Sequence, residues 1–221
     1  GSGVTGDVLK LVLNKYSPLD IEVHKTYKIT KKHIENNPLC LFISYSGNTE
    51  ETVSALEDAI KADLDWCVIS SGGTLLEMAK ENSKPYIEVP SGLQPRAAFG
   101  LMTKAVANFT PESLEVNVEQ NCNDSSFYLN ELLDNESENK IIKKAKEIAN
   151  NIGNKTVIIY GGTQLSYLAS QRWKTQINEN AKSKSYVGYI PEDHHNEILS
   201  WEPDKDGSKN NFHLMFLSDQ N

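Results

Sequence analysis

The stretch Leu39-Cys40-Leu41-Phe42-Ile43-Ser44-Tyr45-Ser46-Gly47-Asn48-Thr49 decides the fold class of this chain. Its first five residues form a short continuous apolar run, the pattern of a strand buried on both faces. Hydroxyl side chains, a glycine and an asparagine follow at once. Beyond them, apolar residues recur at helical spacing, at Val53, Leu56 and Ile60. The stretch therefore predicts a strand, a tight polar loop and a helix.

A loop of this kind suits a bound phosphate. It brings free backbone N–H groups and the positive end of a helix dipole to one point. The hydroxyls of Ser44, Ser46 and Thr49 add hydrogen-bond donors around that point. The alternative is a helix start that Asn48 or Thr49 caps with its own side chain and that binds no ligand. Spacing alone leaves both readings open.

The rest of the chain continues the alternation of strands and helices. Further strands are expected at Ile21–His24, Trp66–Ile69, Pro85–Pro90, Thr156–Tyr160, Tyr186–Ile190 and Phe212–Leu217. Helices are expected at Asp7–Leu13, Glu50–Lys61, Leu75–Ala79, Ala97–Phe109, Lys140–Ile152 and Gln164–Ala181. This alternation predicts an α/β fold with doubly wound, mostly parallel sheets flanked by helices. Ligands of such sheets bind at the carboxyl ends of the strands, where the loops at Ser44 and Ser70 lie.

A polar segment divides the chain into two predicted domains. Residues 111–139 are rich in Asn, Ser and Glu and are expected to be a linker with a short helix around Phe127–Leu133. The first domain then covers residues 1–110 and the second covers residues 140–221. The strand, glycine-rich turn and helix around Gly161–Thr163 repeat the order seen in the first domain, with little sequence identity.

The composition narrows the classes of partner. A formal net charge of −8 over 221 residues argues against nucleic acid and against an anionic membrane, although it leaves a small anionic substrate open. The three cysteines, Cys40, Cys67 and Cys122, have neither disulfide-like nor metal-like spacing. No apolar run is long enough to cross a bilayer and no signal peptide opens the chain, so a cytoplasmic protein is expected.

Three motifs resemble one known family. Ser44-Tyr45-Ser46-Gly47-Asn48-Thr49-Glu50-Glu51-Thr52 resembles the phosphosugar loop of sugar isomerase (SIS) domains. Asn178–Lys182 and Pro191–Asn196 resemble signatures of the bifunctional phosphoglucose/phosphomannose isomerases. The resemblance implies two SIS-type subdomains. It also implies an aldose–ketose isomerase, an intramolecular oxidoreductase that interconverts glucose 6-phosphate and mannose 6-phosphate with fructose 6-phosphate through an enediolate. It implies no cofactor and no metal.

The resemblance also implies roles for individual residues. Glu179 is the implied base that moves a proton between C2 and C1, and Arg96 the cation that stabilises the enediolate. His195, which the motif favours over its neighbour His194, is the implied acid–base group that opens the sugar ring. Substrate-binding roles are implied for six residues: Ser2, Gly3, Ser44, Ser46, Thr49 and Pro95. The resemblance places His195 in the active site of a neighbouring subunit, which implies a homodimer.

The ends of the chain differ from the family pattern. Gly1-Ser2-Gly3 and Asp7 resemble a motif that follows the first strand of the family, so the first domain is expected to lack that strand. The family also uses a lysine near its C-terminus. No residue here matches that lysine, and the second domain is expected to lack its C-terminal part.

Other readings of the same residues remain. A non-catalytic phosphosugar-binding module would carry the same loop but would need neither Glu179 nor His195, and an isomerase of another phosphosugar, such as an amino sugar, is a further possibility. The residue types of the cluster from Glu192 to Glu197 suit zinc. This cluster lacks the His-x-x-x-His spacing of helical zinc sites, so a metal there is disfavoured.

Overall fold

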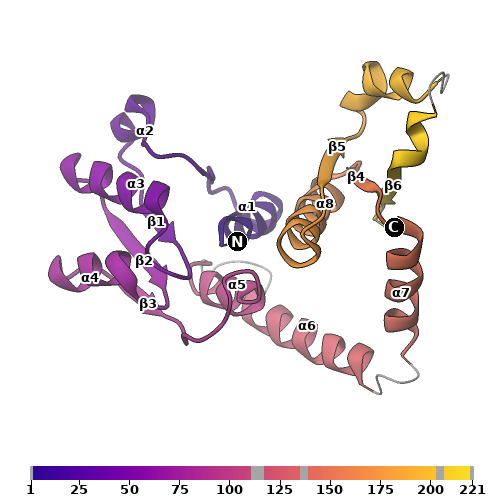
Figure 1. Cartoon of the computed structure of the whole chain (residues 1–221). Coiled ribbons are helices and arrows are strands. Elements are labelled where there is room, and N and C mark those ends of the chain that lie inside the picture. Colours follow the sequence, from indigo (N-terminus) through magenta and orange to yellow (C-terminus); the bar gives the residue numbers. More distant parts are fainter. Residues whose placement is uncertain (1, 111–116, 135–138, 203–206, 220–221) are drawn as a thin grey trace. The chain divides into compact units, whose positions relative to one another are not determined.

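The computed structural model describes residues 2–110, 117–134, 139–202 and 207–219 of the chain. They form two units, Gly1–Glu119 and Gln120–Asn221, each with its own three-stranded parallel sheet (Figure 1). This architecture confirms the predicted α/β class with parallel sheets flanked by helices. The predicted domain and linker ranges stay a prediction, because residues 111–116 and 135–138 of the predicted linker lie outside the described residues.

Strands and helices alternate in the first unit. Its elements are α1 (Gly3–Tyr16), α2 (Lys31–Glu35), β1 (Cys40–Ile43), α3 (Glu50–Lys61), β2 (Trp66–Ser70), α4 (Gly73–Glu81), β3 (Tyr86–Glu88) and α5 (Phe99–Ala107). The sheet has the order β1-β2-β3, and every pair is parallel, with Phe42 opposite Val68 and Val68 opposite Tyr86. Parallel strands end at the same edge of a sheet, so the loops that follow β1, β2 and β3 meet there.

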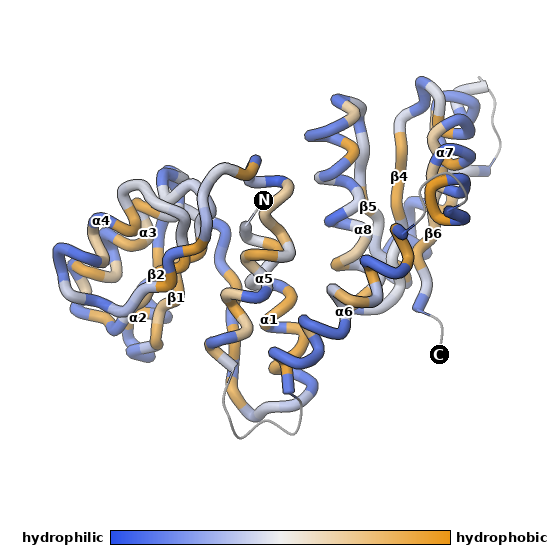
Figure 2. The backbone as a smooth tube through the Cα atoms, turned by 90° about the horizontal axis from the view of Figure 1, so that it is seen from below, coloured by the Kyte–Doolittle hydropathy of each residue, from blue (hydrophilic) through white to orange (hydrophobic). Residues whose placement is uncertain are grey.

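Helices cover both faces of the first sheet, and all five residues of the central strand β2 are buried. On one face, Leu56 of α3 and Leu75 of α4 join Phe42 of β1 in a core cluster. On the other face, Met102 of α5 and residues of α1 pack in a second cluster with Ile69. Figure 2 shows the apolar strands β1 and β2 in orange. This unit is therefore a doubly wound sheet, held by a buried apolar layer on each side.

The second unit is built around a βαβ crossover. Its elements are α7 (Lys140–Ile152), β4 (Thr156–Gly161), α8 (Gln164–Gln176), a π-helical turn (Ile177–Ala181), β5 (Ser185–Tyr189), short 3-10 helices at Glu192–His195, Glu197–Trp201 and Ser208–Asn211, and β6 (Phe212–Leu217). The sheet order is β5-β4-β6, again with parallel pairs. α8 packs against all three strands, and the central strand β4 buries Val157 and Ile159.

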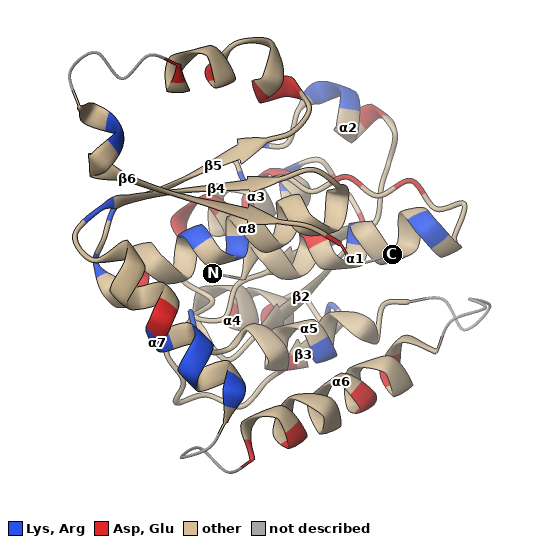
Figure 3. Cartoon of the chain, turned by 90° about the vertical axis from the view of Figure 1, so that its right-hand side faces the viewer, with Lys and Arg blue, Asp and Glu red and all other residues tan. Residues whose placement is uncertain are grey.

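Two further helices, α6 (Val118–Leu133) and α7, carry no fully buried residue. Acidic side chains are spread along α6 and lysines along α7 (Figure 3). The helix predicted around Phe127–Leu133 is real but begins at Val118, nine residues earlier. The Asn and Ser residues of this segment, which suggested a linker, point outward from a helix that they tolerate.

Several predicted boundaries were wrong. Ile21–His24 forms no strand, because no strand in the described part of the chain pairs with it. α1 begins at Gly3 rather than Asp7, and the five-residue helix α2 was not predicted. α5 begins at Phe99, two residues later than expected, so Pro95 lies in a turn before the helix rather than at its first position. β1 lies at a sheet edge and is buried less completely than its apolar sequence suggested.

The described helices also bear on membrane insertion. None of them combines the length and the apolar character needed to cross a bilayer.

Candidate functional site

The loop between β1 and α3 places three hydroxyls at the start of the helix. Ser44 Oγ lies 2.6 Å from Thr49 Oγ1 and 3.5 Å from Ser46 Oγ. Ser44 is buried, whereas Ser46 is exposed to solvent. The loop therefore has a buried hydroxyl pair at its base and an exposed hydroxyl at its rim.

The N-terminus of α3 is left open by the side chains that could have capped it. Thr49 holds the N-cap position with an extended backbone, but its hydroxyl forms no capping hydrogen bond and pairs with Ser44 instead. Asn48 turns toward α4, where its Oδ1 accepts hydrogen bonds from Thr74 N at 3.0 Å and from Thr74 Oγ1 at 3.1 Å. The first N–H groups of a helix have no acceptor within the helix. At α3, Thr52 N and Val53 N donate to Thr49 O, and none of the described hydrogen bonds engages the N–H groups of Glu50 and Glu51. These two groups can meet an anion, although the carboxylates of the same residues oppose one.

Two glycines allow this loop to lie against the loop that follows β2. Gly47 has φ of +68°, and a Cβ there would stand 1.8 Å from the carbonyl oxygen of Gly72. Gly73 has the same φ, and its Cβ would stand 2.5 Å from Ser46 O. Only glycine fits such a contact at a positive φ. Hydrogen bonds from Leu75 N to Gly47 O at 3.0 Å and from Ser71 N to Tyr45 O at 2.9 Å hold the two loops together.

Ser2 and Tyr45 bring two further segments to this edge of the sheet. Ser2 Oγ accepts a hydrogen bond from Tyr45 N at 2.9 Å, and Gly3, the first residue of α1, lies beside the side chain of Lys25. The buried Tyr45 hydroxyl donates to Pro90 O at 3.0 Å and accepts from Leu93 N at 2.9 Å. The residues Ser2, Gly3, Ser44, Ser46 and Thr49, predicted from the sequence, thus gather in one place.

Arg96 and Pro95 follow closely in the chain. They lie in a turn closed by hydrogen bonds from Ala97 N to Gln94 O at 2.8 Å and from Ala98 N to Pro95 O at 3.3 Å. Arg96 is partly buried, and Pro95 is exposed. Because Leu93 is bonded to Tyr45, the segment that leads to Arg96 is anchored to the hydroxyl loop.

The equivalent helix start in the second unit is closed. Thr163 and Ser166 cap α8 reciprocally, with Ser166 N donating to Thr163 Oγ1 at 3.1 Å and Thr163 N donating to Ser166 Oγ at 2.9 Å. The Thr163 hydroxyl also donates to the carboxylate of Asp219. A capped start with a carboxylate beside it disfavours an anion. The two units share the order of strand, turn and helix, but the start of α3 lacks a side-chain cap, whereas that of α8 has one.

Glu179 lies in the π-helical turn that continues α8. π-helical turns are rare and occur frequently at functional sites. Asn178 Nδ2 donates to Ser183 O at 2.8 Å and so fixes this turn to the segment before β5. Burial lowers the pKa of the Arg172 guanidinium, while the negative charge of Glu179 acts in the opposite direction. The partly buried Glu179 carboxylate therefore interacts electrostatically with Arg172 of α8.

His195 is exposed at the end of the short helix Glu192–His195, which follows β5. Asp193 Oδ2 accepts a hydrogen bond from Tyr189 N at 2.5 Å, and Glu197 accepts one from the Tyr160 hydroxyl. Two carboxylates of the cluster from Glu192 to Glu197, whose residue types suit zinc, thus already accept hydrogen bonds from other residues of the second unit.

Tyr160 joins this loop to the central strand. Burial raises the pKa of the Tyr160 hydroxyl well above its usual value, and the hydrogen bond to Glu197 raises it further. The hydroxyl therefore stays protonated and donates a hydrogen bond to Glu197. Trp201 Nε1 donates to the same hydroxyl at 3.1 Å. The loop that carries His195 is therefore anchored at Glu197 and Trp201.

Glu179 and His195 lie toward opposite ends of the strands of the second sheet, Glu179 near the amino ends and His195 beyond the carboxyl ends. α8 starts beyond the carboxyl end of β4 and runs back, so the π turn that holds Glu179 comes just before the amino end of β5. His195 comes after the carboxyl end of β5, a strand of five residues that spans about 17 Å. Within this unit the structure does not bring the two residues together.

Sequence reasoning missed several residues that support these sites. Tyr45 and Asn48 lie inside the motif already singled out, so the signal was present although their roles were not assigned. The contact between Tyr160 and Glu197 joins residues 37 positions apart, and no local pattern indicates it.

Comparison with known proteins gives one family. Residues 141–221 match the family model described as the bacterial phospho-glucose isomerase C-terminal SIS domain. The chain is 39% identical over 183 residues to the bifunctional phosphoglucose/phosphomannose isomerase of Aquifex aeolicus, covering 83% of this chain and 54% of that protein. It is 30% identical over 201 residues to the D-glucosamine-6-phosphate 4-epimerase of Sulfolobus acidocaldarius, covering 90% of this chain and 60% of that protein.

Solved structures agree at the level of the fold. A hypothetical protein from Thermus thermophilus matches 100% of this chain and 58% of its own length, with a TM-score of 0.71 and 14% identity. This chain thus spans little more than half the length of these relatives.

Proposed function

This chain belongs to the SIS-domain family of the bifunctional phosphoglucose/phosphomannose isomerases, and from this premise we propose that the complete protein interconverts glucose 6-phosphate and mannose 6-phosphate with fructose 6-phosphate. The two aldoses differ only at C2 and share one enediolate, so a single base can serve both. These substrates are phosphosugars of central carbon metabolism, and we infer a cytoplasmic enzyme.

The open N-terminus of α3 carries the proposal. A phosphoryl group placed there would receive hydrogen bonds from Ser46, from the hydroxyl pair of Ser44 and Thr49, and from the first N–H groups of the helix. Asn48 and Thr49 leave those N–H groups uncapped, and the start of α8 in the second unit lacks this opening.

The chemistry of isomerisation needs three further groups. We assign Glu179 as the base that carries the proton between C2 and C1, because a partly buried carboxylate beside Arg172 suits that task. Arg96, at the turn anchored through Tyr45, would stabilise the negative charge that develops on the enediolate oxygen. His195 would protonate the ring oxygen, since an imidazole exchanges protons near neutral pH.

The opposite placement of Glu179 and His195 supports a homodimer. One active site that uses both groups would draw them from two subunits, with His195 supplied by the neighbouring copy. The exposure of His195 fits this arrangement, because an imidazole that is exposed on its own subunit can reach the active site of a neighbouring one.

The test is a coupled assay of the complete enzyme with Ser46→Ala/Thr49→Ala. A hydrogen bond to a charged group contributes about 1.5–3 kcal/mol, so the loss of even one of the two bonds should raise KM for fructose 6-phosphate by roughly 10- to 150-fold. Thr163→Ala, at the capped helix start of the second unit, is the matched control and should leave KM unchanged. Normal affinity in the double variant would reject the phosphate site.

The epimerase relative supports a second candidate function, an activity on an amino sugar phosphate. Such an enzyme would use the same phosphate loop. Assaying glucosamine 6-phosphate beside the three proposed substrates separates the two candidates. Binding of all of these phosphosugars without turnover would instead indicate a sensing module.

A further inference from the structure

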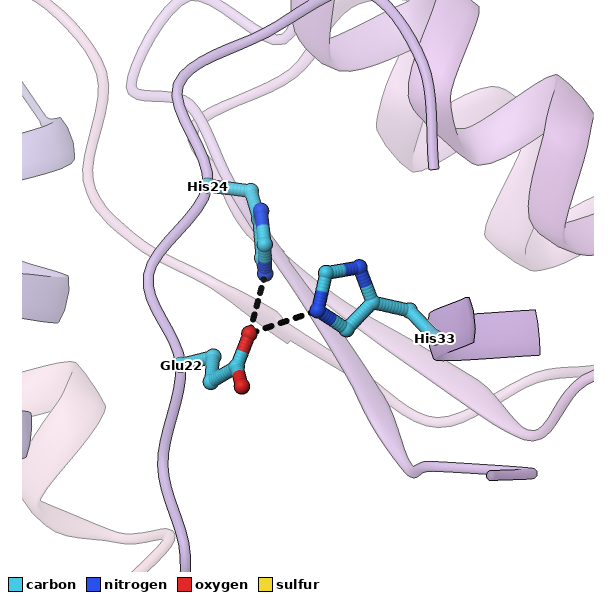
Figure 4. Close-up of side chains that lie close together, drawn as sticks. All are labelled: Glu22, His24 and His33. Atoms are coloured by element: carbon cyan, nitrogen blue, oxygen red, sulfur yellow. Dashed lines mark hydrogen bonds and ion pairs between the residues drawn. The ribbon is translucent and has the colours of Figure 1, made fainter. Parts of the chain in front are cut away.

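Outside the proposed active site, Glu22, His24 and His33 gather their side chains at one point (Figure 4). Glu22 Oε2 lies 2.6 Å from His33 Nε2 and 3.2 Å from His24 Nε2. The two imidazole rings have centroids 4.3 Å apart and meet edge to face. Three possible ligand atoms thus lie within 4.8 Å of one another.

We propose that Glu22, His24 and His33 form a zinc-binding site, to which none of the predicted catalytic or substrate-binding residues contributes. Two imidazole nitrogens and one carboxylate oxygen are donors that Zn²⁺ prefers, and a water would complete four-fold coordination. With bonds of 2.0–2.2 Å, tetrahedral ligand atoms stand about 3.4 Å apart. The two separations between the carboxylate and the imidazoles, 2.6 and 3.2 Å, are shorter than this value, and all three atoms lie within 4.8 Å of one another, so rotations of the exposed Glu22 and His24 side chains would open the site to the ion.

A further hydroxyl orients one ligand. Thr30 Oγ1 lies 2.5 Å from His33 Nδ1, the nitrogen that faces away from Glu22. Metal-binding histidines usually donate their second N–H to such a partner, which fixes the ring and the tautomer. A hydroxyl can accept from Nδ1–H when Nε2 binds metal and donate to Nδ1 when it does not, so Thr30 serves both states.

The position of His33 is set by the core. Ile29 and Ile34, on either side of it in sequence, pack against the cluster of α3 and α4. The side chain of His33 is only 20% exposed, against 46% for His24 and 45% for Glu22.

The consequence of binding is structural. The segment between α1 and α2 has no helix or strand. Besides the packing of Ile29, the ion pairs of Lys25 with Asp7 and of Glu22 with His33 tie it to these two helices. Bound zinc would link this segment to α2. It would stabilise the folded first unit, because the three ligands come together only in the folded state.

The experiment is a calorimetric titration of the metal-stripped protein with Zn²⁺ alone, together with thermal unfolding. One equivalent should bind and raise Tm. His24→Gln/His33→Gln and Glu22→Gln should weaken binding and lose the rise in Tm. Thr30→Val removes only the outer partner and should weaken binding roughly 10- to 100-fold.

Matched controls keep the test specific. Glu35→Gln removes another exposed carboxylate, from α2, and should bind zinc as the wild type does. His194→Gln/His195→Gln removes an adjacent pair of imidazoles in the second unit and should do the same. The absence of binding to the wild-type chain, or binding that persists in His24→Gln/His33→Gln, would overturn the proposal.

Discussion

Thr49 and Glu179 each differ from what is usual for their residue type at that position of a helix. Thr49 occupies an N-cap position, where a threonine normally bonds to the helix, yet its hydroxyl pairs with Ser44. Glu179 lies near the end of a long helical segment, where most glutamates are solvated, yet it is partly buried in a π turn. In the proposed function, Thr49 would bind the phosphoryl group and Glu179 would carry the proton.

The first prediction concerns Glu179 as the proton carrier. Glu179→Gln keeps the shape of the side chain but cannot accept a proton, so kcat should fall at least roughly 10²- to 10⁴-fold while substrate binding stays near normal. The loss should be similar with fructose 6-phosphate and with both aldose phosphates, because they share one enediolate. Wild-type enzyme should carry deuterium from C2 to C1, with part lost to solvent.

Glu147→Gln, on the exposed face of α7, is the control for removing a carboxylate from this unit. It should leave kcat unchanged. Near-normal turnover by Glu179→Gln would remove Glu179 from its assigned role and leave the proposed function resting on the phosphate loop.

At the scale of elements, the site in the first unit depends on how loops are held to one another. Its hydroxyl loop, the loop after β2 and the segment after β3 come from different strands. Tyr45 belongs to the hydroxyl loop. Its backbone carbonyl accepts a hydrogen bond from the loop after β2, and its hydroxyl forms hydrogen bonds with the segment after β3. Rigid anchoring of this kind keeps binding groups at fixed positions before the ligand arrives.

Tyr45→Phe provides the prediction at this scale. It removes two partly buried hydrogen bonds, one to Pro90 O and one from Leu93 N, each worth about 0.5–1.5 kcal/mol, so the free energy of unfolding should fall by about 1–3 kcal/mol. The variant should also raise KM, because the loop that carries Ser46 and the segment that leads to Arg96 lose their link. Chemical denaturation measures the first effect, and steady-state kinetics the second.

Tyr128→Phe, on the exposed surface of α6, tests whether losing any tyrosine hydroxyl has the same effect. It should unfold as the wild type does. Equal stability of Tyr45→Phe and Tyr128→Phe would show that the buried hydroxyl does not hold the loops.

For the whole molecule, the opposite positions of Glu179 and His195 lead to a prediction about assembly. Chains with His195→Ala and chains with Glu179→Gln should each be inactive as homodimers. Mixed dimers, formed after reversible dissociation, should regain part of the activity, since one of their two sites contains both intact groups. Failure to regain activity in verified heterodimers would place both residues in the site of one subunit.

The sequence by itself determined the fold class, the order of strand, polar loop and helix around Ser44, and most helices and strands. Helix and strand formation here follows from local periodicity, and Glu50–Lys61, Lys140–Ile152 and Phe212–Leu217 were predicted to the residue. Ser44, Ser46 and Thr49 lie within six residues of one another in the sequence, which is why their hydroxyls could be predicted to gather at the start of one helix.

Only the tertiary structure decided which groups meet and which do not. The open start of α3 depends on Asn48 bonding to Thr74, 26 residues away, and the anchoring of the His195 loop depends on Tyr160. The failed strand at Ile21–His24 shows the same limit, because a strand needs a partner that its own sequence does not specify. Glu22, His24 and His33 likewise become a cluster only when the segment before α2 folds back onto it.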